Sequence, residues 1–224
     1  MKRYRIVLAY DGTRYAGYQL QENGVAVQQR LEEALAYVNR APVRVFGCSR
    51  TDAGVHARGF CAHVDLDVPI PPKNLVRAMN ARLPDDIRVM RAAFARPDFN
   101  ARNDAKGKEY RYFVYQADIL PPHLAPFWTF CHRPLDLAAM LETPVRTIFA
   151  FTVRRSGPRY TFSVKGDGFL YKQVRSMVGF LLSVGKGNEK PAAVTELLAA
   201  AAPRTARVET APGRGLFLWK VWYR

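Results

Sequence analysis

Residues 108–116 read Lys-Glu-Tyr-Arg-Tyr-Phe-Val-Tyr-Gln, a run of aromatic and β-branched side chains that favours an extended strand. An earlier apolar run at 87–94 also predicts a strand, and no helical pattern separates the two. Strands that follow one another directly along a chain favour antiparallel pairing. The two runs therefore predict an α+β fold on an antiparallel sheet rather than a doubly wound parallel fold.

In the rest of the chain, apolar residues recur with the period typical of strands in some segments and with that typical of helices in others. Further strands are predicted at 3–10, 43–46, 59–67, 147–155, 159–165 and 215–222. Helices are predicted from Val27 to the stop at Pro42, and at 73–83, 169–184 and 196–202. The proline-bearing connection at 120–134 is the most plausible connection between two halves of the chain. As domains, we expect two α+β halves with the ranges 1–105 and 106–224.

The charge balance indicates the class of partner. Thirty-four Lys and Arg residues against nineteen Asp and Glu residues give a net charge of +15. Such an excess attracts polyanions and releases counterions where it meets phosphates, so nucleic acid is the first partner class expected and a membrane surface the second. No stretch approaches the roughly 20 apolar residues of a membrane span. Three cysteines, an odd number without a paired framework, indicate a reducing cytoplasm.

The stretch 46–59, Phe-Gly-Cys-Ser-Arg-Thr-Asp-Ala-Gly-Val-His-Ala-Arg-Gly, is the best candidate for a functional site. It carries one carboxylate, Asp52, between Arg50 and Arg58, and the small residues beside it leave room for a ligand. Gly47 and Gly54 are expected to allow positive φ and a close approach of backbone. The alternative interpretation is an Asx-turn, in which Asp52 only caps its own backbone.

Two further residues could complete such a site. Basic and aromatic residues interleave around Tyr110, an arrangement suited to stacking an unstacked base while holding its backbone. Tyr110 could equally pack over its neighbours in the sheet. Arg175 lies at the edge of the apolar face of the helix predicted at 169–184, where it would either extend towards water or pair with a carboxylate such as Asp52.

The sequence contains no recognised motif for binding a metal ion or a nucleotide. Cys48, His56, Cys61 and His63 have a spacing that matches none of the usual zinc patterns, so the cysteines are expected to be core residues. The glycine motifs that bind nucleotide phosphates are absent, as is the nucleophile elbow of serine hydrolases. The sequence predicts a site with neither metal nor cofactor.

Four segments, taken together, resemble the tRNA pseudouridine synthase A family. They span the chain in the same order as in that family. The segments are Tyr10-Asp11-Gly12-Thr13 with Gly17-Tyr18-Gln19, Arg50-Thr51-Asp52-Ala53-Gly54-Val55-His56-Ala57, Lys108-Glu109-Tyr110-Arg111-Tyr112, and Phe169-Leu170-Tyr171-Lys172-Gln173-Val174-Arg175-Ser176-Met177-Val178-Gly179.

The resemblance implies conversion of uridine to pseudouridine on the 3′ side of the anticodon stem-loop of tRNA, by a cytoplasmic homodimer without metal or cofactor. It implies two halves that share a central antiparallel sheet. Asp52 matches the nucleophile, and Arg175 matches the arginine that pairs with it. Tyr110 matches the residue that stacks on the target base, and Arg50 matches a residue that contacts RNA near the flipped nucleotide.

The chain also departs from the family pattern. Tyr18 stands where the family usually has Trp, and Ser49 where it usually has Gly. Between Met140 and Pro144 the resemblance implies about two dozen further residues near the active site, which Leu141-Glu142-Thr143 replaces here. The alternative function is therefore a non-catalytic tRNA-binding or RNA-chaperone protein that lost activity with the shortened segment.

Overall fold

The computed structural model describes residues 1–142, 149–193 and 208–223. These residues form two compact units. The first unit comprises Met1–Lys108 together with Phe217–Arg224, and the second comprises Glu109–Leu216. The end of the chain thus belongs to the same unit as its beginning.

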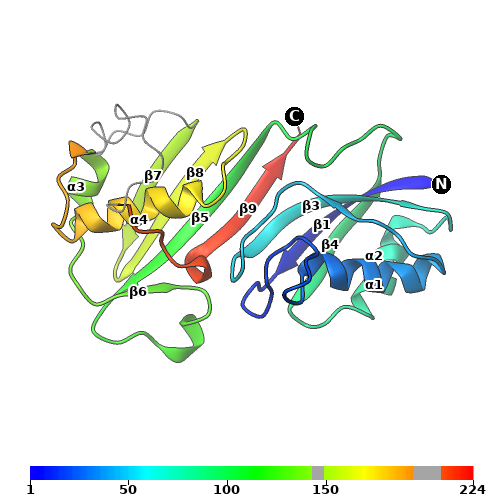
Figure 1. Ribbon diagram of the computed structural model, residues 1–224, viewed down its shortest axis with the longest axis horizontal. Helices are drawn as coiled ribbons and strands as arrows, with labels where there is room; N and C mark the ends of the chain where they lie inside the picture. The colour runs from blue at the N-terminus through cyan, green and yellow to red at the C-terminus, as the bar shows by residue number, and fades with distance from the viewer. Residues whose placement is uncertain (143–148, 194–207, 224) are drawn as a thin grey trace. The chain divides into compact units, whose positions relative to one another are not determined.

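The first unit consists of a sheet with both of its helices on one face (Figure 1). Its strands are β1 (Lys2–Tyr10), β2 (Phe46–Gly47), β3 (His56–Leu66), β4 (Ile87–Phe94) and β9 (Leu216–Trp222). Strand β1 pairs antiparallel with both β3 and β4, whereas β3 pairs with β9 in parallel. The helices are α1 (Val27–Asn39) and α2 (Pro72–Asn80).

Alternation along β1 decides which face the helices cover. Tyr4, Ile6 and Leu8 are fully buried, whereas the residues between them are partly or fully exposed. Helix α1 buries its apolar stripe, including Leu31 and Leu35, because residues at this spacing lie on one side of a helix.

The described part of the second unit contains most of β5 and the long helix α4. Its strands are β5 (Gly107–Gln116), β6 (Thr129–Cys131), β7 (Ala150–Ser156) and β8 (Arg159–Gly166). Its helices are α3 (Leu137–Glu142) and α4 (Gln173–Gly185), with single 3-10 turns at Pro122–Leu124 and Gly213–Gly215. Strands β7 and β8 form an antiparallel hairpin, and Gly157 at its turn has a φ of 56°.

Hydrogen bonding links the strands in the order β4-β1-β3-β9-β5-β8-β7, with β2 beside β3 and β6 beside β5. The described residues thus form a nine-stranded, mainly antiparallel sheet with helices, which confirms the predicted α+β class. Among the described residues, no helix is long and apolar enough to cross a membrane.

The start of the helix predicted at 169–184 was wrong. Helix α4 begins at Gln173 rather than at 169, because Lys172 has a left-handed φ of 58°. Leu170, which lies within the predicted helix range, is 80% exposed, and it exchanges hydrogen bonds with Gln173 ahead of the helix. The helix predicted at 196–202, and the start of the strand predicted at 147–155, lie outside the described residues.

The strand predicted at 43–46 shrinks to Phe46–Gly47. Side chains of α1 hydrogen bond to the backbone of Val45: its N–H donates to Glu32, and its carbonyl accepts from Gln28. These bonds replace the ladder that a longer strand would have needed.

His63 is a neutral histidine within this first unit. It is 4% exposed, and its Nδ1 accepts a hydrogen bond of 3.1 Å from the N–H of Ala101. Burial lowers the pKa of His63, and the charge of Arg3 lowers it further, against the opposing effect of Asp65 and Asp104. Arg3 itself makes a bidentate ion pair with Asp65.

Protonation of His63 should therefore destabilise the fold. Its folded-state pKa lies below the unfolded value, so its contribution is complete above about pH 6.5 and is lost as the pH falls from that value through the lower folded-state pKa. We expect His63→Gln, which keeps an acceptor for Ala101, to flatten the dependence of unfolding free energy on pH between about 7.5 and 5.5. Urea denaturation at several pH values measures this, and an unchanged slope would contradict it.

Candidate active site

Asp52 lies in the loop that connects β2 to β3, residues 48–55, which we call the Asp52 loop. Its side chain is partly buried, between the buried residues Thr51 and Val55. The N–H of Val55 donates to the backbone carbonyl of Asp52 at 3.2 Å, which closes a tight turn. The carboxylate thus sits on a compact turn rather than on a long open loop.

Neighbouring segments fix this turn in place. Tyr10 and Thr51 share a buried hydroxyl–hydroxyl bond of 2.8 Å, and the N–H of Tyr18 donates to the carbonyl of Thr51 at 3.1 Å. The N–H of Gly54 donates to the carbonyl of Tyr15 at 3.4 Å. The segment 10–18 therefore packs against the Asp52 loop and anchors it.

Two glycines in that segment allow the contact. A Cβ on Gly12 would lie 2.0 Å from the carbonyl oxygen of Val55, and one on Gly17 would lie 2.7 Å from that of Thr51. Gly17 also has a φ of 117°, which side chains rarely adopt. The two most N-terminal segments of the family resemblance are thus one packed structure.

The glycines singled out from the sequence divide into two kinds. Gly54 has the expected positive φ, 71°, with open space where a Cβ would be. The expectation of positive φ was wrong for Gly47, whose missing side chain makes room for the rings of Tyr18 and Phe60. These rings stack with centroids 4.3 Å apart, so Tyr18 fills its buried place as a large aromatic residue.

His56 closes the other end of the Asp52 loop. It is fully buried and stacks on Phe217, with ring centroids 4.6 Å apart. Its Nδ1 lies 3.0 Å from both the N–H of Gly12 and a carboxylate oxygen of Asp11. One nitrogen cannot accept from the first and donate to the second. Because an N–H can only donate, we assign His56 as neutral, with Nδ1 as the acceptor.

The arginines near Asp52 have different surroundings. Arg50 is exposed and borders a cavity of about 280 Å³ that is also lined by Arg44 and Arg102. Arg58 instead places its guanidinium over the ring of Trp219, 4.3 Å from the centroid. The predicted positive surroundings of the loop are therefore supplied by Arg50, by Arg44 just before the loop, and by Arg102, which is distant in the sequence.

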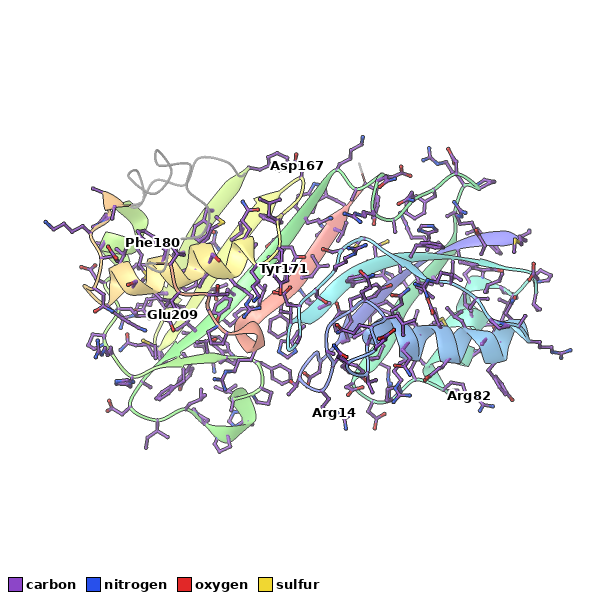
Figure 2. The ribbon with its side chains drawn as sticks, viewed as in Figure 1. Arg14, Arg82, Asp167, Tyr171, Phe180 and Glu209 are labelled. Carbon is purple, nitrogen blue, oxygen red and sulfur yellow. The ribbon has the colours of Figure 1, made fainter. Side chains whose placement is uncertain are left out.

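Tyr110 belongs to the second unit and is 6% exposed on β5. Phe169 meets its ring edge to face, with centroids 5.4 Å apart and an interplanar angle of 89°. The segment just before α4, where Figure 2 marks Tyr171, thus helps to orient the Tyr110 ring.

Arg175 is held on α4 in the same unit. Its Nε donates to the carbonyl of Ala211 at 2.7 Å, and the N–H of Ala211 donates back to the carbonyl of Arg175 at 3.1 Å. Gly179, one turn later, lets the chain at Glu209 (Figure 2) approach the helix, because a Cβ there would lie 1.8 Å from the Glu209 carbonyl oxygen. Asp52 and Arg50 thus share one loop of the first unit, while Tyr110 and Arg175 belong to the second.

The cysteines and histidines near Asp52 are built into the core. Cys48 and Cys61 are buried free thiols, and burial raises the pKa of Cys48 to about 12 and that of Cys61 to about 11. They remain protonated at neutral pH, as packed core residues do. Among the described residues, no group of three or more His, Cys, Asp or Glu side chains could hold a metal ion.

Sequence reasoning missed the part that Lys108 has in this region. The interleaving of charge and aromatic rings suggested a lysine facing RNA. Instead Lys108 is 9% exposed, and its Nζ donates to the carbonyl of Cys48 at 2.8 Å. The signal in the sequence was that Lys108 shares the alternating register of the inward-facing residues of the predicted strand. A lysine at such a position is buried, and a buried ammonium needs hydrogen-bond acceptors.

The sequence model of the family described as "tRNA pseudouridine synthase" matches residues 6–103 and 127–224. The chain belongs to this family. Enzymes of the family are isomerases. The proteins named tRNA pseudouridine synthase A from Exiguobacterium sibiricum and Geobacter sulfurreducens are 41% and 38% identical to it. The first match covers 100% of this chain and 97% of the relative, and the second covers 99% of each.

A protein of the same name from Staphylococcus aureus is 36% identical, over 98% of this chain and 91% of the relative. The match to the Exiguobacterium sibiricum protein extends over 247 positions, although this chain has 224 residues. That relative therefore has residues without a counterpart here, which agrees with the expected shortening. The stretch where the shortening was placed runs into residues outside the described part of the chain, which resumes at Phe149.

The close packing of segment 10–18 against the Asp52 loop can be tested at Gly17. We expect Gly17→Ala to destabilise the fold by about 1 to 3 kcal/mol more than Gly157→Ala does, because the first forces backbone apart as well as straining φ. Gly157 is the matched control, since it has positive φ but open space at the Cβ position. Urea denaturation of the two variants measures the difference, and equal losses would refute the close-packing argument.

Proposed function

We propose that the chain isomerises uridine to pseudouridine on the 3′ side of the anticodon stem-loop of tRNA, with Asp52 as the nucleophile. The observation that carries the proposal is the Asp52 loop: a partly buried carboxylate on a turn whose backbone is anchored at Thr51, Gly54 and Val55. It occurs in a chain whose family membership extends over nearly its whole length.

The reaction suits such a site. The C–N glycosidic bond breaks and the same base is rejoined to the ribose through carbon, so no atom is gained or lost and no co-substrate is required. An ionised carboxylate can attack the ribose or the base and leave again once the new bond has formed. A firmly held carboxylate favours this chemistry, because its geometry need not be organised during the reaction.

We assign Tyr110 to the target base, Arg175 to the carboxylate of Asp52, and Arg50 to RNA near the flipped nucleotide. The tight packing of Phe169 on Tyr110 supports the first role, because a fixed ring offers a stacking surface at little cost in entropy. The second role is supported by the family resemblance of the segment that contains Arg175. Exposure of Arg50 among other arginines supports the third.

The partner and setting follow from the same proposal. The net charge of +15 suits a polyanionic substrate such as tRNA, and its binding should weaken steeply with salt. We also propose a homodimer that acts in the cytoplasm, as the family resemblance implies. Sedimentation equilibrium of the purified chain distinguishes a dimer from a monomer.

The nucleophile is tested by Asp52→Asn, which keeps the shape and removes the charge. We expect pseudouridine formation to fall about a thousandfold or more, while the Kd for tRNA changes by less than about threefold. Mapping of pseudouridine in tRNA after incubation measures the product. Asp98→Asn, at an exposed carboxylate of the same unit, is the matched control.

Substantial formation of pseudouridine by the Asp52→Asn variant would contradict the assignment of Asp52 as the nucleophile. Tight tRNA binding by the unmodified chain without any product would favour the alternative, an RNA-binding or RNA-chaperone protein without catalysis.

The stacking role is tested at Tyr110 with two substitutions. Tyr110→Phe keeps the aromatic ring and should retain most activity, whereas Tyr110→Leu keeps an apolar core residue and should lose about tenfold or more. Single-turnover rates with both folded variants measure this. Similar rates for Phe and Leu would show that Tyr110 has only a packing role.

A further inference from the structure

A lysine lies buried at the beginning of the Asp52 loop. Lys108 is the second residue of β5 and is 9% exposed. Removing an ammonium from water costs several kcal/mol unless acceptors replace the lost water. Its Nζ donates to the backbone carbonyl of Cys48 at 2.8 Å, a short hydrogen bond from a charged donor. A buried charge has thus been placed on the backbone that leads to Asp52.

Cys48 is a point where such a bond can control the loop. Its N–H donates to the carbonyl of Cys61 on β3 at 2.8 Å, which continues the β2–β3 ladder by one residue. Beyond Cys48 the chain leaves the sheet and turns towards Asp52. With its N–H held by β3 and its carbonyl held by Lys108, the two peptide planes on either side of the Cys48 Cα are both restrained at the exit from the sheet.

Three neutral hydrogen bonds with segment 10–18 also anchor the loop further along it. They are the hydroxyl of Tyr10 on Thr51, the N–H of Tyr18 on the Thr51 carbonyl, and the N–H of Gly54 on the Tyr15 carbonyl. Lys108 therefore supplies a charged anchor at the entry, and the segment 10–18 supplies neutral anchors at the turn. Charge-assisted bonds are roughly twice as strong as neutral ones.

We propose that Lys108 is a positioning residue, which fixes the Cys48 carbonyl and thereby the entry of the Asp52 loop, so that the carboxylate is held for attack. This inference rests on the proposed function for its catalytic consequence. The constraint on the loop itself does not depend on that function.

Lys108→Met tests the proposal, because methionine has a similar length and no charge. The matched control is Lys106→Met, which removes the same charge from an exposed position two residues earlier. We expect Lys108→Met to slow the single-turnover rate about ten- to a hundredfold, with the tRNA Kd within about threefold of that of Lys106→Met. A residue that only binds RNA would change the Kd, and a residue of no consequence would change neither.

A second readout is independent of catalysis. We expect amide hydrogen exchange in residues 48–55 to speed up in Lys108→Met and to stay unchanged in Lys106→Met. If the unmodified chain forms no pseudouridine, the proposed function fails, whereas this measurement still decides whether Lys108 holds the loop. Unchanged exchange in Lys108→Met would overturn the inference, as would a loss confined to tRNA affinity.

Should the methionine variant fail to fold, Lys108→Arg carries the test, because it retains a positive donor. We expect a folded protein with exchange in residues 48–55 close to that of the unmodified chain. Fast exchange there in a folded Lys108→Arg variant would overturn the role of the charge.

Discussion

The contact between two backbones, without side chains between them, is the constraint on which the site depends. Segment 10–18 and the Asp52 loop approach so closely that neither Gly12 nor Gly17 could carry a Cβ. Polar backbone groups brought this close must hydrogen bond, and the bonds to Thr51, Gly54 and His56 satisfy that need. The orientation of Asp52 is thus a consequence of how an N-terminal loop packs against it.

Much of the fold was predictable because its signals are local. Alternation gives β1, β3, β4 and β5 to within a few residues, and the stripe of Val27, Leu31 and Leu35 gives α1. The errors arise where a distant group decides. Val45 looks like a strand residue but bonds to side chains of α1, and Lys172 adopts a left-handed conformation that no periodicity announces.

The site shows the same division. The sequence marks Asp52 by its small neighbours, and the positive φ of Gly54 follows from residue type. It could not tell that Gly47 accommodates aromatic rings or that Arg58 stacks on Trp219, because those partners are far away in the chain. Lys108 was misjudged for a related reason: composition suggests a lysine that faces phosphate, and only the fold buries it.

The shortened length bears on activity through the question of which residues support the carboxylate. The Exiguobacterium sibiricum relative has residues that this chain lacks, yet the contacts described for the Asp52 loop come from segment 10–18, from Cys61 and from Lys108. All of these residues are present here and lie in one compact unit. The residues that this chain lacks are therefore not needed for these described contacts.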